Sequence, residues 1–136
     1  MKKISLILAF LACFAGPAAA DWNQLGVSGR GTTDYYVDIH TKHQTTDGTV
    51  AIAYLYDMHK MRECETGEPK MYLSRSGDHE FDCNARTYRV ASCTRFADHM
   101  ASGQVVSTDA APGEWSQIPP RSSIMKMYKV ACSASR

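Results

Sequence analysis

Hydrophobic and polar residues alternate along several short segments of the chain, as they do in half-buried β-strands. The alternation is clearest over residues 34–40 and 49–57, and the Asp47-Gly48 pair between them favours a hairpin turn because glycine accepts a positive φ angle. Four more segments have strand patterns: residues 71–76, 79–83, 86–96 and 104–107. The first two of these flank Ser76-Gly77-Asp78, which predicts a second hairpin.

One helix is predicted near the C-terminus. Ser122 or Ser123 is a suitable N-cap, and the apolar positions that follow form one helical stripe: Ile124, Met127, Tyr128 and Ala131. In the second strand, Ala51 and Ala53 point away from the large side chains, and the helix is expected to cover this alanine side. The predicted fold class is therefore α+β, a single antiparallel sheet of about six strands with a C-terminal helix packed on it.

The remaining segments lack a clear period. Residues 21–33 are rich in glycine and are expected to form a flexible lead-in, with Trp22 as a core anchor. Residues 58–70 are expected to form a loop that Cys64 tacks to the body of the domain. Trp115 is expected to help close the domain ahead of the helix.

Residues 1–20 have the pattern of a signal peptide. A basic start precedes an apolar run over residues 4–14, which is shorter than the roughly 20 residues that a membrane-spanning helix needs. Cleavage after Ala20 leaves a mature domain over residues 21–136, exported to the periplasm or to the cell surface and outer membrane. Lipidation at Cys13 is the alternative, less favoured because the residue three positions before it is not the leucine common in lipoprotein signals.

Charge and cysteine content narrow the class of protein. Loss of the two signal-peptide lysines leaves 13 basic and 14 acidic residues, whereas nucleic-acid-binding domains normally have a basic excess. Nucleic acid is therefore not an expected partner. Four cysteines remain in the mature chain, and an even number behind a signal peptide predicts disulfides because exported compartments are oxidising. Three connectivities are open among Cys64, Cys83, Cys93 and Cys132.

No arrangement of residues indicates catalysis or a cofactor. The sequence has no Gly-x-Ser-x-Gly nucleophile motif. Its cysteine spacings of 19, 10 and 39 residues differ from the short spacings typical of structural zinc sites. The expectation is a non-enzymatic domain without a cofactor or a metal ion.

Arginines form the candidate binding feature. Arg86, Arg89 and Arg95 lie on one predicted strand, with Arg75 on a predicted neighbour. Arginines and tyrosines suit protein-binding surfaces, so the three are taken as a candidate partner-binding patch. The simpler interpretation is a solvated sheet face that carries the aliphatic stems of these side chains.

Several short motifs are spread over the mature chain: Trp22, Tyr36-Val37-Asp38, Asp47-Gly48, Ser74, Glu80-Phe81-Asp82-Cys83, Gly103-Gln104-Val105-Val106, Trp115, Ile118-Pro119, Ser123 and Val130-Ala131-Cys132. In this combination the chain resembles the surface-adhesin protein E family of Gram-negative bacteria. The resemblance covers nearly the whole mature chain.

The resemblance implies a sheet of about six strands with a helix on it and a disulfide between Cys83 and Cys132. Cys64 and Cys93 are then left as a second pair. It also implies a surface protein that binds host extracellular-matrix or plasma glycoproteins and is able to form a homodimer. The alternative function is a periplasmic inhibitor or accessory protein of an enzyme.

Overall fold

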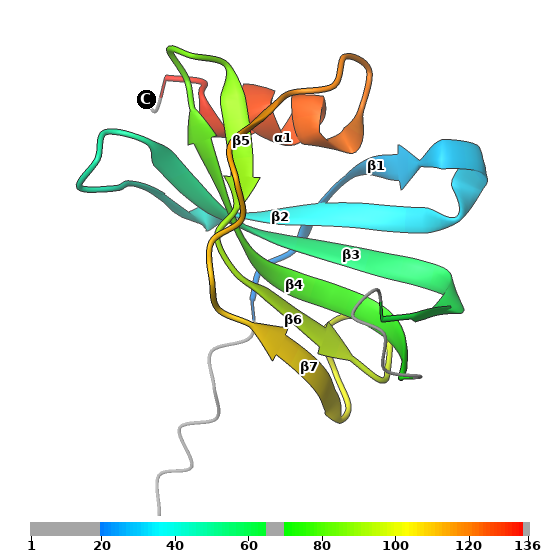
Figure 1. Ribbon diagram of the computed structural model, residues 1–136. Helices are drawn as coiled ribbons and strands as arrows, with labels where there is room; N and C mark the ends of the chain where they lie inside the picture. Colours follow the sequence, from blue (N-terminus) through cyan, green and yellow to red (C-terminus); the bar gives the residue numbers. More distant parts are fainter. Residues whose placement is uncertain (1–19, 65–69, 135–136) are drawn as a thin grey trace, which may run out of the picture.

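The computed structural model describes residues 20–64 and 70–134, so the predicted signal peptide and Cys13 lie outside the described residues. These residues form one antiparallel sheet of eight strands and one α-helix (Figure 1). Within them, no helix is long and apolar enough to cross a membrane. The elements in chain order are β1 (Asn23–Ser28), the short 3-10 helix η1 (Gly29–Gly31), β2 (Thr33–Gln44), β3 (Val50–Glu63), β4 (Met71–Asp82), β5 (Thr87–Val90), β6 (Cys93–Phe96), β7 (Val105–Asp109), β8 (Ser116–Gln117) and α1 (Ser123–Ala131).

The strands β1 to β4 are antiparallel neighbours in chain order, and the sheet then divides. One half of β4 pairs with β5, which pairs with β8, while the other half pairs with β6, which pairs with β7. The predicted α+β class, the single antiparallel sheet and the C-terminal helix are confirmed. The structure has eight strands and not about six. Two strands, β1 and β8, were not predicted. The two predicted strands at residues 71–76 and 79–83 form one strand, and the single one predicted at residues 86–96 forms two.

The hairpin predicted about Ser76-Gly77-Asp78 is wrong, because β4 is one continuous strand. Gly77 is needed for a different reason: a Cβ atom at this position would collide with the carbonyl oxygen of Ser92. That same oxygen accepts a hydrogen bond of 3.2 Å from the hydroxyl of Tyr54, the partner of Gly77 on β3. The glycine therefore marks a close approach of two backbones and not a turn.

The single strand predicted over residues 86–96 is also wrong, because a β-bulge divides it into β5 and β6. The backbone N–H groups of Ala91 and Ser92 both approach the carbonyl oxygen of Asp78, at 2.8 and 3.4 Å. Two residues thus stand opposite one, which is the definition of a bulge.

The bulge changes which side chains share a face of the sheet. Val90 pairs with His79 on one side of it, and Thr94 pairs with Ser76 on the other. Four steps along β5 and β6 therefore match three steps along β4. Beyond the bulge the alternation is reversed, so Arg95 lies on the same face as Val90, whereas an unbroken strand would place them on opposite faces.

Two segments that were expected to be irregular are strands. Residues 21–33 contain β1, which pairs with β2 and is not a flexible lead-in. The predicted loop over residues 58–70 is strand as far as residue 63, where Arg62 pairs with Tyr72. Pairing with a neighbouring strand overrides weak local preference. The rest of that loop, residues 65–69, lies outside the described residues.

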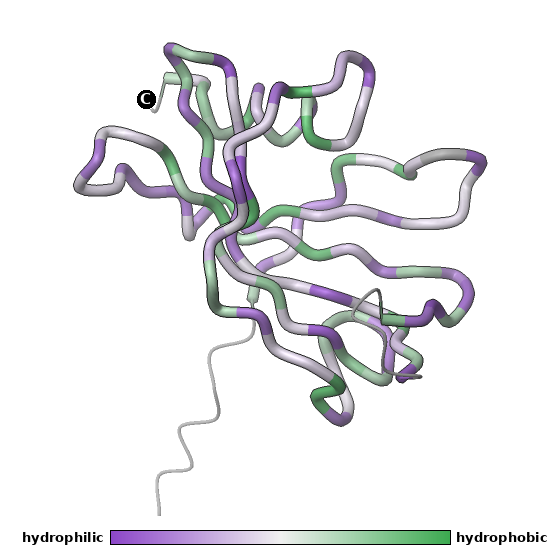
Figure 2. The backbone as a smooth tube through the Cα atoms, in the orientation of Figure 1, coloured by the Kyte–Doolittle hydropathy of each residue, from purple (hydrophilic) through white to green (hydrophobic). Residues whose placement is uncertain are grey.

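The hydrophobic core lies between α1 and one face of the sheet, which we call the aromatic face. Hydrophobic and hydrophilic positions alternate along the strands (Figure 2), and the aromatic face collects six ring-bearing side chains: Tyr35, Tyr54, Tyr56, His79, Phe81 and Tyr88. The helix buries Ile124, Met127 and Ala131 against this face. The expectation that the helix covers the alanine side of β3 is therefore wrong, because the large rings offer more apolar area to bury.

Both ends of α1 are fixed. The Ser122 hydroxyl accepts a hydrogen bond of 3.1 Å from the Met125 backbone N–H and caps the first turn, as predicted. At the other end, the Lys42 ammonium donates to the backbone carbonyl oxygens of Val130 and Ser133, at 3.1 and 2.8 Å. A cation is favourable there, because this is the negative end of the helix dipole. The disulfide between Cys83 and Cys132 joins this end to the residue that follows β4.

The second predicted disulfide, between Cys64 and Cys93, is not formed, and both residues are buried thiols. Cys93 begins β6 and lies opposite Asp109 of β7. The Cys64 sulfur lies instead 3.9 Å from the hydroxyl of Ser107. Each of the two thiols is thus buried on its own, and the predicted second disulfide is wrong.

We expect the mature protein, denatured without a reductant, to react with two equivalents of a maleimide reagent. The label should fall on Cys64 and Cys93, and peptide mapping without reduction should link Cys83 to Cys132. Reduction before labelling should raise the uptake to four equivalents. A non-reduced sample that takes up no label would contradict the two free thiols.

A second prediction concerns the close approach at Gly77. The Gly77→Ala substitution should lower the free energy of unfolding by about 1–3 kcal/mol, because the added methyl group overpacks a backbone contact. The matched control is Gly113→Ala, whose Cβ atom would meet the Val90 carbonyl oxygen at an ordinary 3.5 Å and should change stability by less than about 0.5 kcal/mol. Urea denaturation measures both, and equal effects would disprove the role given to Gly77.

Candidate functional site

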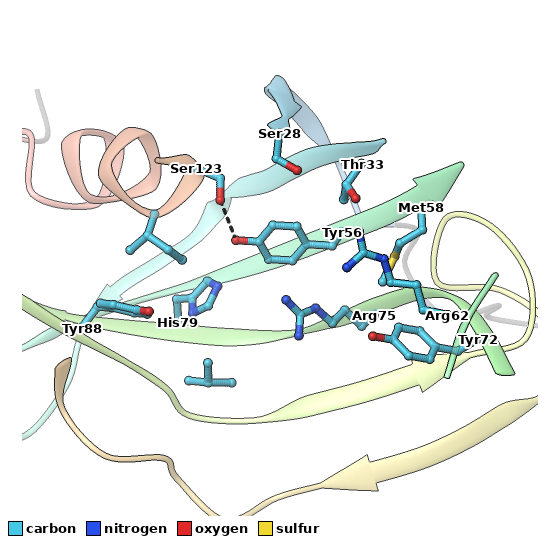
Figure 3. A pocket seen from close by; sticks show the side chains of 12 residues that line it. Ser28, Thr33, Tyr56, Met58, Arg62, Tyr72, Arg75, His79, Tyr88 and Ser123 are labelled. Atoms are coloured by element: carbon cyan, nitrogen blue, oxygen red, sulfur yellow. Dashed lines mark hydrogen bonds between the residues drawn. The ribbon is translucent and has the colours of Figure 1, made fainter. Parts of the chain in front are cut away.

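A pocket of about 330 Å³ opens on the aromatic face beside the first residues of α1 (Figure 3). Strands β1 to β5 and α1 all contribute to its lining. Two arginines, Arg62 and Arg75, line it, and no Asp or Glu of the described chain does. We call it the arginine pocket. Its volume lies in the range of roughly 300–1,000 Å³ that is typical of small-molecule sites.

Neighbouring strands place the two arginines. Arg75 of β4 pairs with Tyr56 of β3, and its guanidinium carbon lies 4.8 Å from the centre of that ring. Arg62 of β3 pairs with Tyr72 of β4. Figure 3 shows both arginine side chains reaching toward the middle of the pocket. The Tyr56 hydroxyl is itself held by the hydroxyl of Ser123, 3.1 Å away on the helix.

A third arginine extends this positive charge. Arg95 of β6 stands directly opposite Arg75 of β4, and its guanidinium carbon lies 5.5 Å from the centre of the Tyr72 ring. Arg95 is only 9% exposed. The buried Nε atoms of Arg75 and Arg95 have no hydrogen-bond partner among the described residues. Like charges directly opposite each other destabilise a sheet. The described neighbours do not compensate the positive charge of Arg75 and Arg95 with an acidic side chain.

His79 lies at the base of the pocket. Its ring stacks on Tyr54 with 3.9 Å between the ring centres, and the residue is 2% exposed. Within the described chain, neither ring nitrogen forms a hydrogen bond of acceptable geometry. Burial, followed by the charge of Arg75, lowers the pKa of His79 to about 3, and the backbone of Arg89 offsets only part of this. The imidazole is therefore neutral at pH 7, with one donor and one acceptor nitrogen.

The three arginines predicted as one patch do not lie together. Arg86 is exposed in the turn after β4, where its φ angle is 57°. Arg89 of β5 lies on the face opposite the aromatic face, and its Nε donates to a carboxylate oxygen of Glu80 at 2.6 Å. Arg95 is buried on the aromatic face. The bulge between β5 and β6 separates Arg95 from Arg89, because it reverses the alternation of side chains, and Arg86 precedes β5 altogether.

The tryptophans expected to act as anchors lie outside the core cluster. Trp22 is half-buried, and Trp115 is 40% exposed. The guanidinium carbon of Arg89 lies 4.7 Å from the centre of the Trp115 ring. Glu80, Arg89 and Trp115 thus form a small group, in which Trp115 is exposed and the other two residues are half-buried. We call it the Trp115–Arg89 cluster.

Sequence reasoning missed Arg62 and His79 as parts of a site. Arg62 fell in a predicted loop, and His79 was weighed only as a possible zinc ligand beside Cys83 and Cys93. Asp57 and Asp78 are close to Arg75 along β3 and β4, and only the strand pairing shows that they lie on the other face of the sheet, outside the pocket. Among residues 20–64 and 70–134, no three His, Cys, Asp or Glu side chains gather as they would around a metal ion.

The fold and these sites define a small binding domain, a disulfide-bonded sheet with one helix on its aromatic face. The sequence matches the family described as surface-adhesin protein E over residues 22–133. The chain therefore belongs to the surface-adhesin protein E family. With the fold, this membership makes it a surface-adhesin-like binding domain.

Solved structures of protein E from Haemophilus influenzae share this fold. The selenomethionine form is 12% identical, with a TM-score of 0.59 over 80% of this chain and 84% of that one. A second structure is 10% identical, with a TM-score of 0.56 over 82% and 92%. Protein E from non-typeable Haemophilus influenzae is 9% identical, with a TM-score of 0.56 over 83% of this chain and 77% of that one. No curated protein matches the sequence.

The buried His79 predicts a specific pH dependence. Its pKa is about 3 in the folded protein and 6.5 in the unfolded chain, so between these values the unfolded chain binds one more proton. The contribution of His79 to the free energy of unfolding is therefore largest above about pH 6.5. It decreases as the pH falls, by up to about 1.4 kcal/mol per pH unit. Replacing His79 by Phe, which keeps a ring on Tyr54, should make the decrease between pH 6 and pH 4 shallower.

Urea denaturation at pH 4, 5, 6 and 7 measures this difference, since acidic residues titrate alike in both proteins. His43→Gln, which removes an exposed imidazole, serves as the control and should follow the unsubstituted protein. Parallel curves for the His79→Phe variant and the unsubstituted protein would show that His79 is not protonated on unfolding.

Proposed function

We propose that the chain is an exported, non-enzymatic domain that binds extracellular-matrix or plasma glycoproteins of a host. The observation that carries this proposal is the family match over residues 22–133, which includes both cysteines of the disulfide. The proposal includes cleavage after Ala20 and display at the cell surface. No observation on the described residues favours the alternative, an inhibitor or accessory protein of an enzyme.

The Trp115–Arg89 cluster supports this proposal as a contact surface. Tryptophan and arginine are enriched among the residues that dominate protein–protein binding. Arg89 is held between the Glu80 carboxylate and the Trp115 ring, so little side-chain freedom remains to be lost on binding. Arg86 adds an exposed positive charge in the turn that precedes β5. Arg95 does not belong to this surface, because it is buried on the other face.

A homodimer is part of the same proposal. β1 is an edge strand of the sheet, and Val27 on it is 50% exposed. Unpaired edge strands are sites where a second chain can pair. Size-exclusion chromatography with light scattering on the mature protein would give twice the monomer mass if the dimer forms.

We expect Trp115→Ala to lower the affinity for a host glycoprotein at least about tenfold, because truncating an aromatic hot spot of an interface typically costs about 2 kcal/mol or more. Arg89→Gln should weaken binding less and should reduce its dependence on salt. Surface plasmon resonance over immobilised vitronectin, laminin and plasminogen, at two salt concentrations, measures both effects.

The matched control is Val105→Ala, which changes an exposed apolar residue on β7. It should leave the affinity unchanged. The proposal fails if the unsubstituted protein binds none of the three glycoproteins, or if antibody labelling of intact cells finds none of it at the surface. If the Trp115→Ala variant binds as tightly as the unsubstituted protein, the contact surface lies elsewhere.

A further inference from the structure

The arginine pocket holds polar groups that the described residues leave unsatisfied. Among the described residues, the buried Arg75 Nε and both ring nitrogens of His79 have no hydrogen-bond partner of acceptable geometry, although the backbone of Arg89 lies near the imidazole. Buried polar groups in folded proteins are almost always paired with protein, water or a ligand. His79 is nearly fully buried, so bulk water does not reach it freely. The pocket is therefore built to receive polar atoms that this part of the chain does not supply.

The charge of the pocket has one sign. Arg62 and Arg75 line it, Arg95 stands opposite Arg75, and none of the three forms an ion pair with a residue of the described ranges. This arrangement is unfavourable unless an anion lies between the guanidinium groups. Elsewhere in the same sheet Arg89 is paired with Glu80, so the missing carboxylate is a local feature of the pocket.

The rim adds further donors. Helix α1 begins at Ser123, which lines the pocket together with Ile124. The first turn of a helix presents partial positive charge from its unpaired N–H groups. The hydroxyl groups of Tyr56 and Ser123, 3.1 Å apart, lie at the same rim. A negatively charged group at the centre of the pocket thus meets guanidinium, hydroxyl and helix-terminal groups together.

One wall of the pocket is apolar. Tyr88, Val90 and Ile124 are among its lining residues, and a volume of about 330 Å³ exceeds what a bare inorganic anion fills. We propose that the arginine pocket binds a small organic anion, with its carboxylate or phosphate group between Arg62 and Arg75 and its apolar body against Val90 and Ile124. The planar guanidinium fork of arginine suits the two oxygens of such a group.

This inference goes beyond host-protein binding and does not require it. The Trp115–Arg89 cluster and the pocket lie on opposite faces of the sheet, so each can fail without the other. The same chemistry has two sources, a free organic acid or an acidic side chain of a bound protein. A competition arm in the experiment distinguishes them.

The experiment titrates the mature, disulfide-bonded protein with benzoate, phenyl phosphate, inorganic phosphate and the neutral isostere benzamide. Calorimetry gives the affinity, and the ring resonances of His79 in an NMR spectrum report on the pocket itself. We expect saturable binding of benzoate or phenyl phosphate with a shift of the His79 resonances. Inorganic phosphate should bind at least about tenfold more weakly than phenyl phosphate, and benzamide should not bind.

Arg75→Gln should weaken the binding of phenyl phosphate about tenfold or more, because it removes a charge-assisted hydrogen bond. Arg62→Gln, at an exposed position, should weaken it in the same direction and guards against misfolding of the first variant. Arg75→Lys keeps the charge without the fork and should restore part of the affinity. Arg86→Gln removes an equal charge outside the pocket and should change nothing.

Binding that is equal in Arg75→Gln, Arg62→Gln and Arg86→Gln would overturn the proposal, because it would reflect net charge alone. Equal affinity for inorganic and phenyl phosphate, or binding of benzamide, would overturn it as well. If phenyl phosphate binds and also displaces a host glycoprotein, the natural anion is a side chain of the partner. Binding without displacement identifies a free organic acid.

Discussion

The structure depends on how much of the aromatic face one short helix covers. A helix of nine residues is about 14 Å long, whereas the twelve residues of β4 span about 40 Å. The disulfide between Cys83 and Cys132 fixes the helix over the half of the sheet where β4 ends. Rings such as Phe81 and Tyr54 are fully buried there. The other half lacks this cover, and it is where arginine stems and tyrosine rings replace aliphatic side chains.

The arginine pocket lies at the boundary between these two halves. The first residue of the helix, Ser123, reaches Tyr56, and Tyr56 in turn supports the guanidinium of Arg75. Ser123 and Ile124 both line the pocket, so the N-cap at Ser122 places the first turn of the helix at its edge.

The sequence reveals periodic elements well and non-local backbone contacts poorly. The first hairpin, the N-cap and the stripe of α1 are local patterns, and the structure has them as predicted. Gly77 looks like a turn residue in the sequence, because the carbonyl oxygen that requires a glycine there belongs to Ser92, in the distant bulge between β5 and β6. Ala91 and Ser92 carry no local sign of a bulge, so an unbroken strand over residues 86–96 places Arg95 on the wrong face. The candidate site depends on that register, and Arg75 therefore entered the sequence analysis only as a neighbour of the predicted arginine patch.

The same bulge separates two kinds of arginine. Arg89, before it, lies across from Glu80 and is neutralised in the cluster with Trp115. Arg95, after it, lies on the aromatic face and stands opposite Arg75, and the described residues give it no acidic partner. One additional residue in a strand thus divides a single run of basic sequence between an outer surface suited to a protein partner and an inner pocket suited to an anion. Deleting one of the two bulge residues, Ala91 or Ser92, would place Arg95 on the outer face. It would also relieve the repulsion that makes the pocket attractive to negative charge.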